Sequence, residues 1–507
     1  MPQTFLRLCA AGSRSAAIVL ALPDARYHLP RQVNWRLSSQ RGNVQLGETR
    51  TVMVCLHDLE PGTRYRFEAE GELLEFRTEP CAGAVRLDQF GASEDAEDNR
   101  EAFARAIAAV LHGGTLIVPR GTWKTGPVQL KSAMTLYLED GAVLAAIGER
   151  GGWPVLEAQD DDGKMLGSWE GLPARCYAGV VNAVGAQALS ITGQGVIDGG
   201  GDRGDWWTWP KETREGARRP RLMHLIGCEE VLLLGVTICN SPSWTVHPQG
   251  CNRLIAAGLH ISNPPDSPNT DGLDPESCTD VLIEGVRFSV GDDCIAIKSG
   301  KRTASQICHL APTRGVTVRH CLMERGHGGV VLGSEMSGGI HDVLVEDCEM
   351  VDTDRGLRIK TRRGRGGTVS GVTFRRVDMD GVHAALTANA FYFCDPDGHD
   401  AWVQDRAPAL VDVTTPEIRD ILVEDVRLKN VSVAAGAFLG LPEAPITGIR
   451  VRDMSVTYAP DGQAGVPVMA DGVRSMRHMP LVIENAELIC ETTGSGPQLE
   501  ICEGVSS

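Results

Sequence analysis

The sequence is short of aromatic residues, long apolar runs and basic charge. Only 5% of its 507 residues are Phe, Trp or Tyr, and 49 Lys and Arg are outnumbered by 66 Asp and Glu, which gives a net charge of −17. This negative charge argues against nucleic acid as a partner. No apolar stretch approaches the length of a membrane span, so a membrane partner is not expected either. An anionic ligand would need a local cluster of cations.

Paired cysteine motifs are also missing. The fifteen cysteines are odd in number and scattered, and no Cys/His spacing predicts a zinc site. Several of them recur beside a repeated segment, where they are expected to pack as small apolar residues in a reducing compartment. Ser13-Arg14-Ser15 interrupts the apolar stretch within residues 1–23, which we interpret as two strands rather than an export signal. The sequence thus predicts a cytoplasmic protein, with a secreted or periplasmic location as the alternative.

A repeat of alternating apolar residues dominates the chain from residue 189 onward. Its copies begin at Leu189, Val231, Leu254, Val281, Val316, Val343, Val372, Ile421 and Ile449. Alternation with a period of two predicts short strands with one buried face. Spacings of roughly 20–50 residues, with insertions between the strands, are typical of a solenoid. The expected fold class is all-β: a right-handed parallel β-helix over residues 85–500.

Residues 1–80 lack the repeat. The run Leu59-Glu60-Pro61-Gly62-Thr63-Arg64-Tyr65-Arg66-Phe67 resembles the fibronectin type III pattern, with Tyr65 as its corner tyrosine. We therefore expect a small β-sandwich domain at residues 1–80, with Trp35 in its core. A helix over 99–111 and a strand over 113–119 should cap the solenoid. The Trp-rich stretch 148–220 should be an insertion that lies over one face.

Four polar clusters punctuate successive copies of the repeat. They are Asn269-Thr270-Asp271, Gly291-Asp292-Asp293, Gly326-His327-Gly328 and Arg358-Ile359-Lys360. Each is separated from the next by one coil, and equivalent residues on adjacent coils lie about 4.8 Å apart. All four clusters should therefore line one groove about 15 Å long. Read singly, each cluster could instead be only a turn of the solenoid, and the paired Asp could bind Ca²⁺.

The chemistry of this set fits hydrolysis of an acidic sugar. Crowded carboxylates cannot all ionise, so one of Asp271, Asp292 and Asp293 should be protonated near neutral pH. A proton donor and a water-activating base are then present together without a metal or another cofactor. Two fixed cations, Arg358 and Lys360, could hold the carboxylate of the sugar.

These motifs resemble the polygalacturonases of glycoside hydrolase family 28 over about residues 85–460. The stretch from His320 to Ser334 fits the histidine signature of that family throughout. The resemblance implies inverting hydrolysis of α-1,4 bonds between galacturonate units, with polygalacturonate or oligogalacturonides as substrate.

The resemblance also implies roles for individual residues. Asp292 would be the general acid, Asp271 and Asp293 would activate the water, and His327 would tune the acid's proton. The substrate would be bound by Arg358, Lys360, Asn269 and Lys298.

Two features resemble the exo-acting bacterial branch of the family. One is the fibronectin-like domain ahead of the β-helix, and the other is the run Gly333-Ser334-Glu335-Met336-Ser337-Gly338-Gly339. Exo action requires a groove that is blocked at one end, and residues 148–220 could block it. The alternatives are a rhamnogalacturonan or xylogalacturonan hydrolase of the same family, a Ca²⁺-dependent pectate lyase, and a non-catalytic carbohydrate-binding β-helix.

Overall fold

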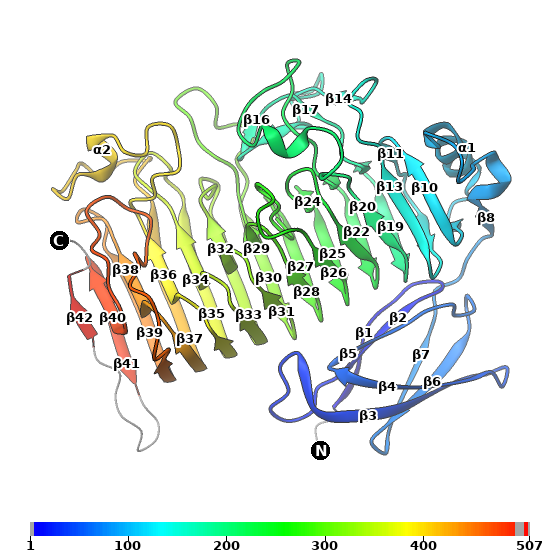
Figure 1. Cartoon of the computed structure of the whole chain (residues 1–507), viewed down its shortest axis with the longest axis horizontal. Coiled ribbons are helices and arrows are strands. Elements are labelled where there is room, and N and C mark those ends of the chain that lie inside the picture. Colours follow the sequence, from blue (N-terminus) through cyan, green and yellow to red (C-terminus); the bar gives the residue numbers. More distant parts are fainter. Residues whose placement is uncertain (1–4, 492–500, 505–507) are drawn as a thin grey trace.

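Two antiparallel sheets form the N-terminal part of the computed structural model, which describes residues 5–491 and 501–504 (Figure 1). One sheet contains β1 (Leu6–Ala11), β2 (Ala16–Leu20) and β5 (Met53–Leu56); the other contains β4 (Val44–Thr51), β3 (His28–Ser39), β6 (Arg64–Ala69) and β7 (Glu72–Arg77). The stretch expected to form two strands is β1 and β2. The hydroxyl of Tyr65 accepts a hydrogen bond of 2.8 Å from the backbone N–H of Glu60. A β-sandwich is thus present, and its assignment as fibronectin type III-like stays a prediction.

A cap leads from the sandwich into the solenoid. β8 (Ala84–Arg86) pairs in parallel with β9 (Gly114–Val118), and between them lie the 3₁₀ helix η1 (Leu87–Phe90) and α1 (Arg100–Ala109). The predicted helix and strand are confirmed to within a few residues. α1 buries Ala102, Phe103, Ala106 and Ile107 in the core at the end of the coil.

The largest sheet is a parallel ladder of twenty strands that starts with β8 and β9. Its other strands are β10 (Gly121–Thr125), β12 (Met134–Leu138), β13 (Ala142–Ala146), β19 (Gln187–Gly193), β20 (Val196–Asp198), β22 (Glu229–Leu234), β23 (Thr237–Cys239), β25 (Asn252–Ala257), β26 (His260–Ser262), β27 (Thr279–Glu284), β28 (Arg287–Ser289), β30 (Thr313–Arg319), β31 (Leu322–Glu324), β33 (Ile340–Val351), β35 (Thr368–Asp380), β37 (Glu417–Val431), β39 (Ile446–Tyr458) and β41 (Ala486–Glu491). The repeat is confirmed in full, because each start position pairs with the next, from Leu189 to Ile449.

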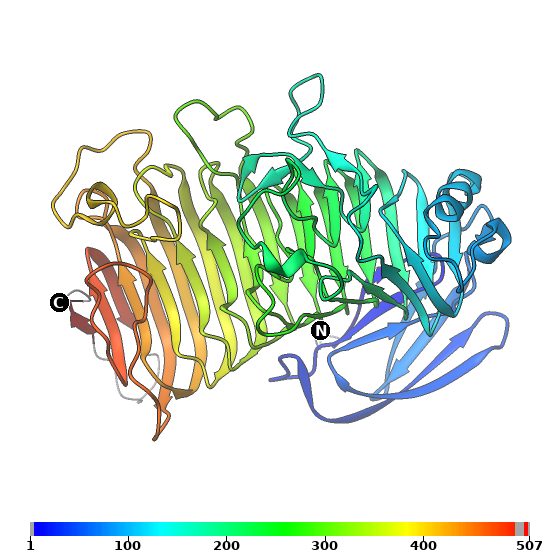
Figure 2. The same cartoon turned by 45° about the horizontal axis from the view of Figure 1, so that its top comes forward.

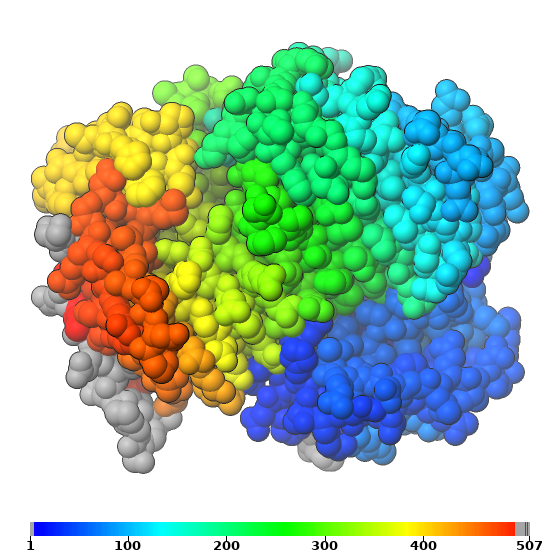
Figure 3. Space-filling view, in the orientation of Figure 1, coloured from blue at the N-terminus to red at the C-terminus, as the bar shows by residue number. Residues whose placement is uncertain are grey.

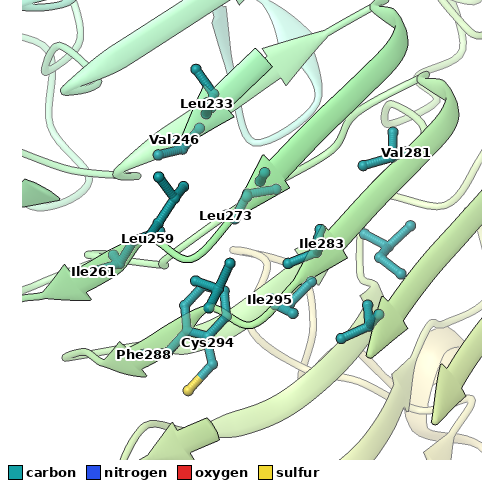
Figure 4. Close-up of a cluster of buried hydrophobic side chains, with 14 of the residues drawn as sticks. Leu233, Val246, Leu259, Ile261, Leu273, Val281, Ile283, Phe288, Cys294 and Ile295 are labelled. Carbon is teal, nitrogen blue, oxygen red and sulfur yellow. The ribbon is translucent and has the colours of Figure 1, made fainter. Parts of the chain in front are cut away.

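A second parallel face carries the polar clusters. It consists of β11 (Val128–Gln129), β18 (Val181–Val184), β21 (Met223–Ile226) and β24 (Val246–Gln249), followed by β29 (Asp293–Ile297), β32 (Gly328–Gly333), β34 (Arg355–Lys360), β36 (Ala384–Asn389), β38 (Ala434–Leu439), β40 (Met479–Glu484) and β42 (Ile501–Glu503). Bridges from Val246 to Leu273 and from Leu273 to Ile295 join the two groups. We call this face the site sheet. Between the sheets lies one apolar core, part of which is shown in Figure 4.

The sandwich packs along a row of turns in the solenoid, on the side away from the long loops (Figures 1 and 3). Seven residues at equivalent turn positions of the repeat all have positive φ: Gly235, Gly258, Gly285, His320, Asp347, Arg376 and Asp425. The first three must be glycine because a Cβ there would collide with His57, Cys55 and Met53 of the sandwich. Further along the row, Arg26 of the sandwich lies within 4.0 Å of three acids on successive coils, Asp347, Asp378 and Asp425.

Long loops rise from the opposite side of the solenoid (Figure 2). The predicted insertion holds two small hairpins, β14 (Val155–Leu156) with β17 (Cys176–Tyr177) and β15 (Ser168–Trp169) with β16 (Leu172–Pro173), and the 3₁₀ helix η2 (Trp206–Thr208). A loop with α2 (Ala401–Gln404) lies further along. Within residues 5–491 and 501–504, no helix is long and apolar enough to cross a membrane.

Candidate active site

The four polar clusters lie on successive coils of the site sheet. Asp293 pairs with Gly328, and Val331 pairs with Arg358. Asp271 lies in the coil before β29, where its carbonyl accepts a hydrogen bond of 2.8 Å from the N–H of Thr245. The sequence prediction that the clusters meet is therefore correct.

The chain bends at the paired acids, and the bend has a local cause. Cys294, Ile295 and Ile297 all point into the core, so regular alternation is broken at the start of β29. Asp293 and Lys298 consequently face outward, toward a pocket of about 410 Å³.

Three carboxylates line this pocket. Asp271, Asp292 and Asp293 each place one oxygen within 4.8 Å of the others. Their exposure differs: the side chain of Asp292 is 22% exposed, against 5% for Asp271 and 1% for Asp293. Asp292 is thus the acid most accessible to a ligand.

Asp293 is held as an anion. Its carboxylate contacts Lys360 Nζ at 2.6 Å and Arg358 Nη1 at 3.3 Å. Burial alone would raise the pKa of Asp293, but these two cations hold it well below its usual range. The predicted substrate clamp, Arg358 and Lys360, therefore contacts Asp293.

Asp271 holds a proton at neutral pH. Burial and the neighbouring charge of Asp292 raise the pKa of Asp271 to about 8, although Lys298 Nζ lies 3.6 Å away.

His327 supplies a second proton. Its Nδ1 lies 3.2 Å from Asp292 Oδ1. This hydrogen bond raises the pKa of His327 to about 9, so the ring is an imidazolium at neutral pH. A proton therefore sits directly against the most exposed acid.

Two further predicted residues also line the pocket. Arg219 Nη2 donates a hydrogen bond of 2.5 Å to Asn269 Oδ1. Lys298 lies between Asp271 and Glu335, at 3.6 and 3.4 Å, and 4.3 Å above the Trp244 ring. All eight residues predicted for the site are therefore among the pocket-lining residues.

Sequence reasoning missed several residues that also line the pocket. They include Glu335, Tyr392, Asp354, Arg355 and Met469. A signal existed for Glu335, because it follows β32 directly in the run from Gly333 to Gly339. None existed for Tyr392 and Met469, which reach the pocket on loops from later coils.

The three acids could also form a metal-binding site, since carboxylates within 4.8 Å of one another can ligate Ca²⁺ or Mg²⁺. Here Lys298, Lys360 and Arg358 already lie at ion-pair distance from Asp271 and Asp293. These fixed cations compensate the same charge that a metal would, so the set fits proton transfer better than metal binding.

The site sheet is covered on the N-terminal side of the acids. His224 pairs with His247, and the bridge from Val246 to Leu273 places His247 beside Asp274. All three side chains point away from the core but are fully buried. The insertion covers them: Ser168 Oγ donates to Gln249 Oε1 at 3.0 Å, and Trp169 stacks on Trp244 at 6.3 Å.

The sheet is also covered on the C-terminal side. Thr387 and Asn389 pair with Arg358 and Lys360 on the next coil, and both are less than 5% exposed. A loop over residues 465–476 lies above them, and the carbonyl of its Met469 accepts a hydrogen bond of 2.9 Å from Asn389 Nδ2. Met469 Sδ is also 3.0 Å from Arg358 Nη2. The result is a pocket that is closed at both ends rather than an open groove.

A larger hollow of about 990 Å³ lies elsewhere, between the sandwich and the β-helix. Its walls include Ala10, Thr135, Leu232 and Arg253, and none of the four clusters contributes to it. The chemistry is therefore confined to the smaller pocket.

Comparison with known proteins identifies the family. Residues 174–468 match the model of Glycosyl hydrolases family 28. A "Probable polygalacturonase" from Vitis vinifera is 34% identical over 397 residues, which cover 76% of this chain and 77% of that protein. The structure of a hyperthermoactive exopolygalacturonase from Thermotoga maritima aligns with a TM-score of 0.66 at 27% identity, over 83% of this chain and 92% of that one.

The Family 28 exopolygalacturonase from Yersinia enterocolitica shares the fold along nearly the whole chain. It aligns with a TM-score of 0.67 at 20% identity and covers 98% of this chain and 97% of its own. With the parallel β-helix, the acids brought together on its coils and the family match over more than half of the sequence, the chain belongs to glycosyl hydrolase family 28 and is a glycosidase of the polygalacturonase type.

Proposed function

We propose that this glycosidase removes units from the ends of polygalacturonate or oligogalacturonides, by inverting hydrolysis of α-1,4 bonds between galacturonates. The observation that carries the proposal is the closure of the site sheet on both sides of the acids. His247 and Asp274 on one side, and Thr387 and Asn389 on the other, occupy positions that an open groove would expose, yet all are buried. A long polymer cannot lie across such a site, whereas a chain end can enter it.

The acidic substrate follows from the charge of the pocket. Arg358 and Lys360 point outward two residues apart on β34, and a planar guanidinium matches a carboxylate. Both cations contact Asp293. A bound uronate would share them and would thereby place its ring beside the acids.

Asp292 is the proposed proton donor. It is the most exposed acid and accepts a hydrogen bond from His327, so the proton lost to the leaving oxygen can be replaced from the imidazolium. Asp293, which the cations keep ionised, and Asp271 would orient the attacking water. Asp271 is the rival donor, because its raised pKa of about 8 keeps it protonated at neutral pH.

The spacing of the acids differs from the value expected for inverting enzymes. Carboxyl groups roughly 6.5–9.5 Å apart are typical of that class, but here the closest oxygens lie within 4.8 Å. With three acids instead of two, a water can be shared by one pair while the third faces the leaving oxygen. The inverting proposal thus rests on the family resemblance and needs direct measurement of the product's configuration.

Two measurements test the proposed function. Digestion of polygalacturonate should release mono- or disaccharide from the first minutes and barely lower the viscosity; an early ladder of intermediate oligomers would disprove exo action. NMR should show the released sugar first as the β-anomer, and an α-anomer would disprove single displacement.

A Ca²⁺-dependent lyase is the main alternative chemistry. A lyase forms an unsaturated product and loses activity with a chelator, whereas we expect neither here. Rhamnogalacturonan should be a poor substrate, because its backbone rhamnose has no carboxylate for Arg358 and Lys360. Xylogalacturonan should be a poor substrate because its side branch would also have to fit a pocket of about 410 Å³.

The cytoplasmic location predicted from the sequence finds no support in the relatives, which are named as plant and bacterial polygalacturonases. The secreted or periplasmic alternative fits them. Fractionation of the native host with an activity assay on each fraction would decide.

A further inference from the structure

We propose that Arg355 binds the carboxylate of the second galacturonate, while Arg358 and Lys360 bind that of the galacturonate beside the acids. This inference rests on the proposed function, because it assigns a new anion-binding position within the same pocket. Arg355 belongs to none of the four clusters and was not expected to take part in the site.

The position of Arg355 follows from the register of the site sheet. Asp293 pairs with Gly328, and continuing the pairing of Val330 with Leu357 places Gly328 beside Arg355. Arg355 therefore lies two strands from Asp293, or about 10 Å. Gly328 has no side chain to fill the space between, and a Cβ there would lie only 3.1 Å from Asp293 Oδ1.

Arg355 and Arg358 share the outer face although they are three residues apart. A break in the alternation explains this. Leu357 belongs to the core, and a Cβ on Gly356 would point at the core side chain of Met379. Gly356 and Leu357 thus both face the core, as Cys294 and Ile295 do on β29. Arg355 consequently lies on the same face as the pocket.

Among the described residues, Arg355 has a single ion-pair partner, and that partner is more exposed than those of the other cations in the pocket. Lys298, Arg358 and Lys360 each have a buried carboxylate within 3.6 Å. The nearest carboxylate to Arg355 is Asp354, at 3.7 Å from its Nη1, and Asp354 also lies 3.2 Å from His383. Burial and the nearby charge of Arg358 lower the pKa of Arg355 to about 10. A second anion would relieve this imbalance.

The donor geometry leaves one side of the guanidinium for a ligand. Nε donates to the carbonyl of Pro467 at 3.1 Å, and Nη2 donates to that of Val466 at 3.0 Å. Among the described residues, Nη1 has no hydrogen-bond acceptor, and Arg355 lines the pocket. These two carbonyl contacts fix the guanidinium in place, and they also anchor the loop over residues 465–476. The test must therefore separate anion binding from loop anchoring.

The test measures Kd by calorimetry in an Asp292→Asn background that does not cleave. The ligands are digalacturonate and the two mixed disaccharides in which one galacturonate or the other is replaced by galactose. Each carboxylate that meets a cation should be worth about 10–100-fold in Kd. Lys360→Met should abolish the preference for digalacturonate over the mixed disaccharide that lacks the carboxylate bound by Lys360. Arg355→Gln should abolish the preference over the mixed disaccharide that lacks the other carboxylate. Arg355→Lys should restore part of the second preference, since it keeps the charge but cannot hold both carbonyls.

Three results would overturn the proposal. Arg355→Gln could weaken the binding of all three ligands equally and lower Tm, which is the result expected if Arg355 only anchors the loop. Both variants could abolish the same preference, which would merge Arg355 with the existing clamp. Digalacturonate could fail to bind at all. Failure of the proposed function is a separate outcome, because it appears as absent turnover by the unmodified protein.

Discussion

The assignment of the proton donor leads to the sharpest prediction. Asp292→Asn keeps the size of the side chain but removes its proton, so it should lower kcat on an oligogalacturonide by about 10²–10⁴. This loss corresponds to about 2.7–5.4 kcal/mol of transition-state stabilisation. Folding should be unchanged, because Asp292 is the least buried of the three acids and, among the described residues, has only His327 as a side-chain partner on another coil.

The assay compares two substrates. A nitrophenyl galacturonide releases a weakly basic phenolate that leaves without a proton, so Asp292→Asn should lose less than about tenfold on it. Asp354→Asn is the matched control, since it removes a carboxylate from the same pocket without removing a proposed proton donor. Its kcat should fall by less than about tenfold on both substrates.

The rival assignment gives a different pattern. If Asp271 is the donor, as its raised pKa allows, Asp271→Asn is the variant rescued by the activated substrate. Asp292→Asn would then be equally impaired on both substrates. That result would refute the reasoning from exposure and from the His327 contact.

Three further predictions concern charge. Lys360→Met should lower kcat/KM on acidic substrates by about 30–1000-fold, or about 2–4 kcal/mol, because both Asp293 and the substrate carboxylate lose a partner; unchanged kinetics would exclude the clamp. For Asp271, whose pKa of about 8 in the folded protein lies above the ordinary value of about 4 for an aspartate, protonation favours the folded state at low pH, and this contribution is lost as pH rises from about 4 through 8. Asp271→Asn should therefore match the unmodified protein in Tm at pH 4 and exceed it at pH 9, and a parallel pH profile would contradict the shift. Arg26→Met should destabilise the protein by about 1–3 kcal/mol in denaturant unfolding, because the acids it contacts are left unpaired but are partly exposed; no change would mean that the sandwich is not held by this contact.

The role of the sandwich follows from its contacts. It lies on the turn side of the solenoid, and none of its residues lines the pocket. Its core continues into Leu234 and Ala257 of the β-helix, and Arg26 reaches the coils of Asp347, Asp378 and Asp425. Because these contacts join the sandwich to several coils, we expect the sandwich to stabilise the solenoid.

The sequence alone determined the coil and the acids. Alternating residues from Leu189 to Ile449 decide which side chains face the core, and the number of residues between copies decides which coil each cluster occupies. Both properties are local in the chain, so the meeting of Asp271, Asp293 and Arg358 could be predicted before any coordinate was known.

Only the tertiary structure decided how the acids are protonated and what surrounds them. The raised pKa of Asp271 depends on desolvation, which loops from distant coils provide. Met469 reaches Arg358 across 111 residues of sequence, and Ser168 reaches Gln249 across 81. The outward position of Arg355 depends on a break in the alternation of β34 that the sequence of the strand does not predict. The path of a loop over a sheet is set by long-range packing and leaves no period in the sequence, so the closed pocket could be found only in the folded chain.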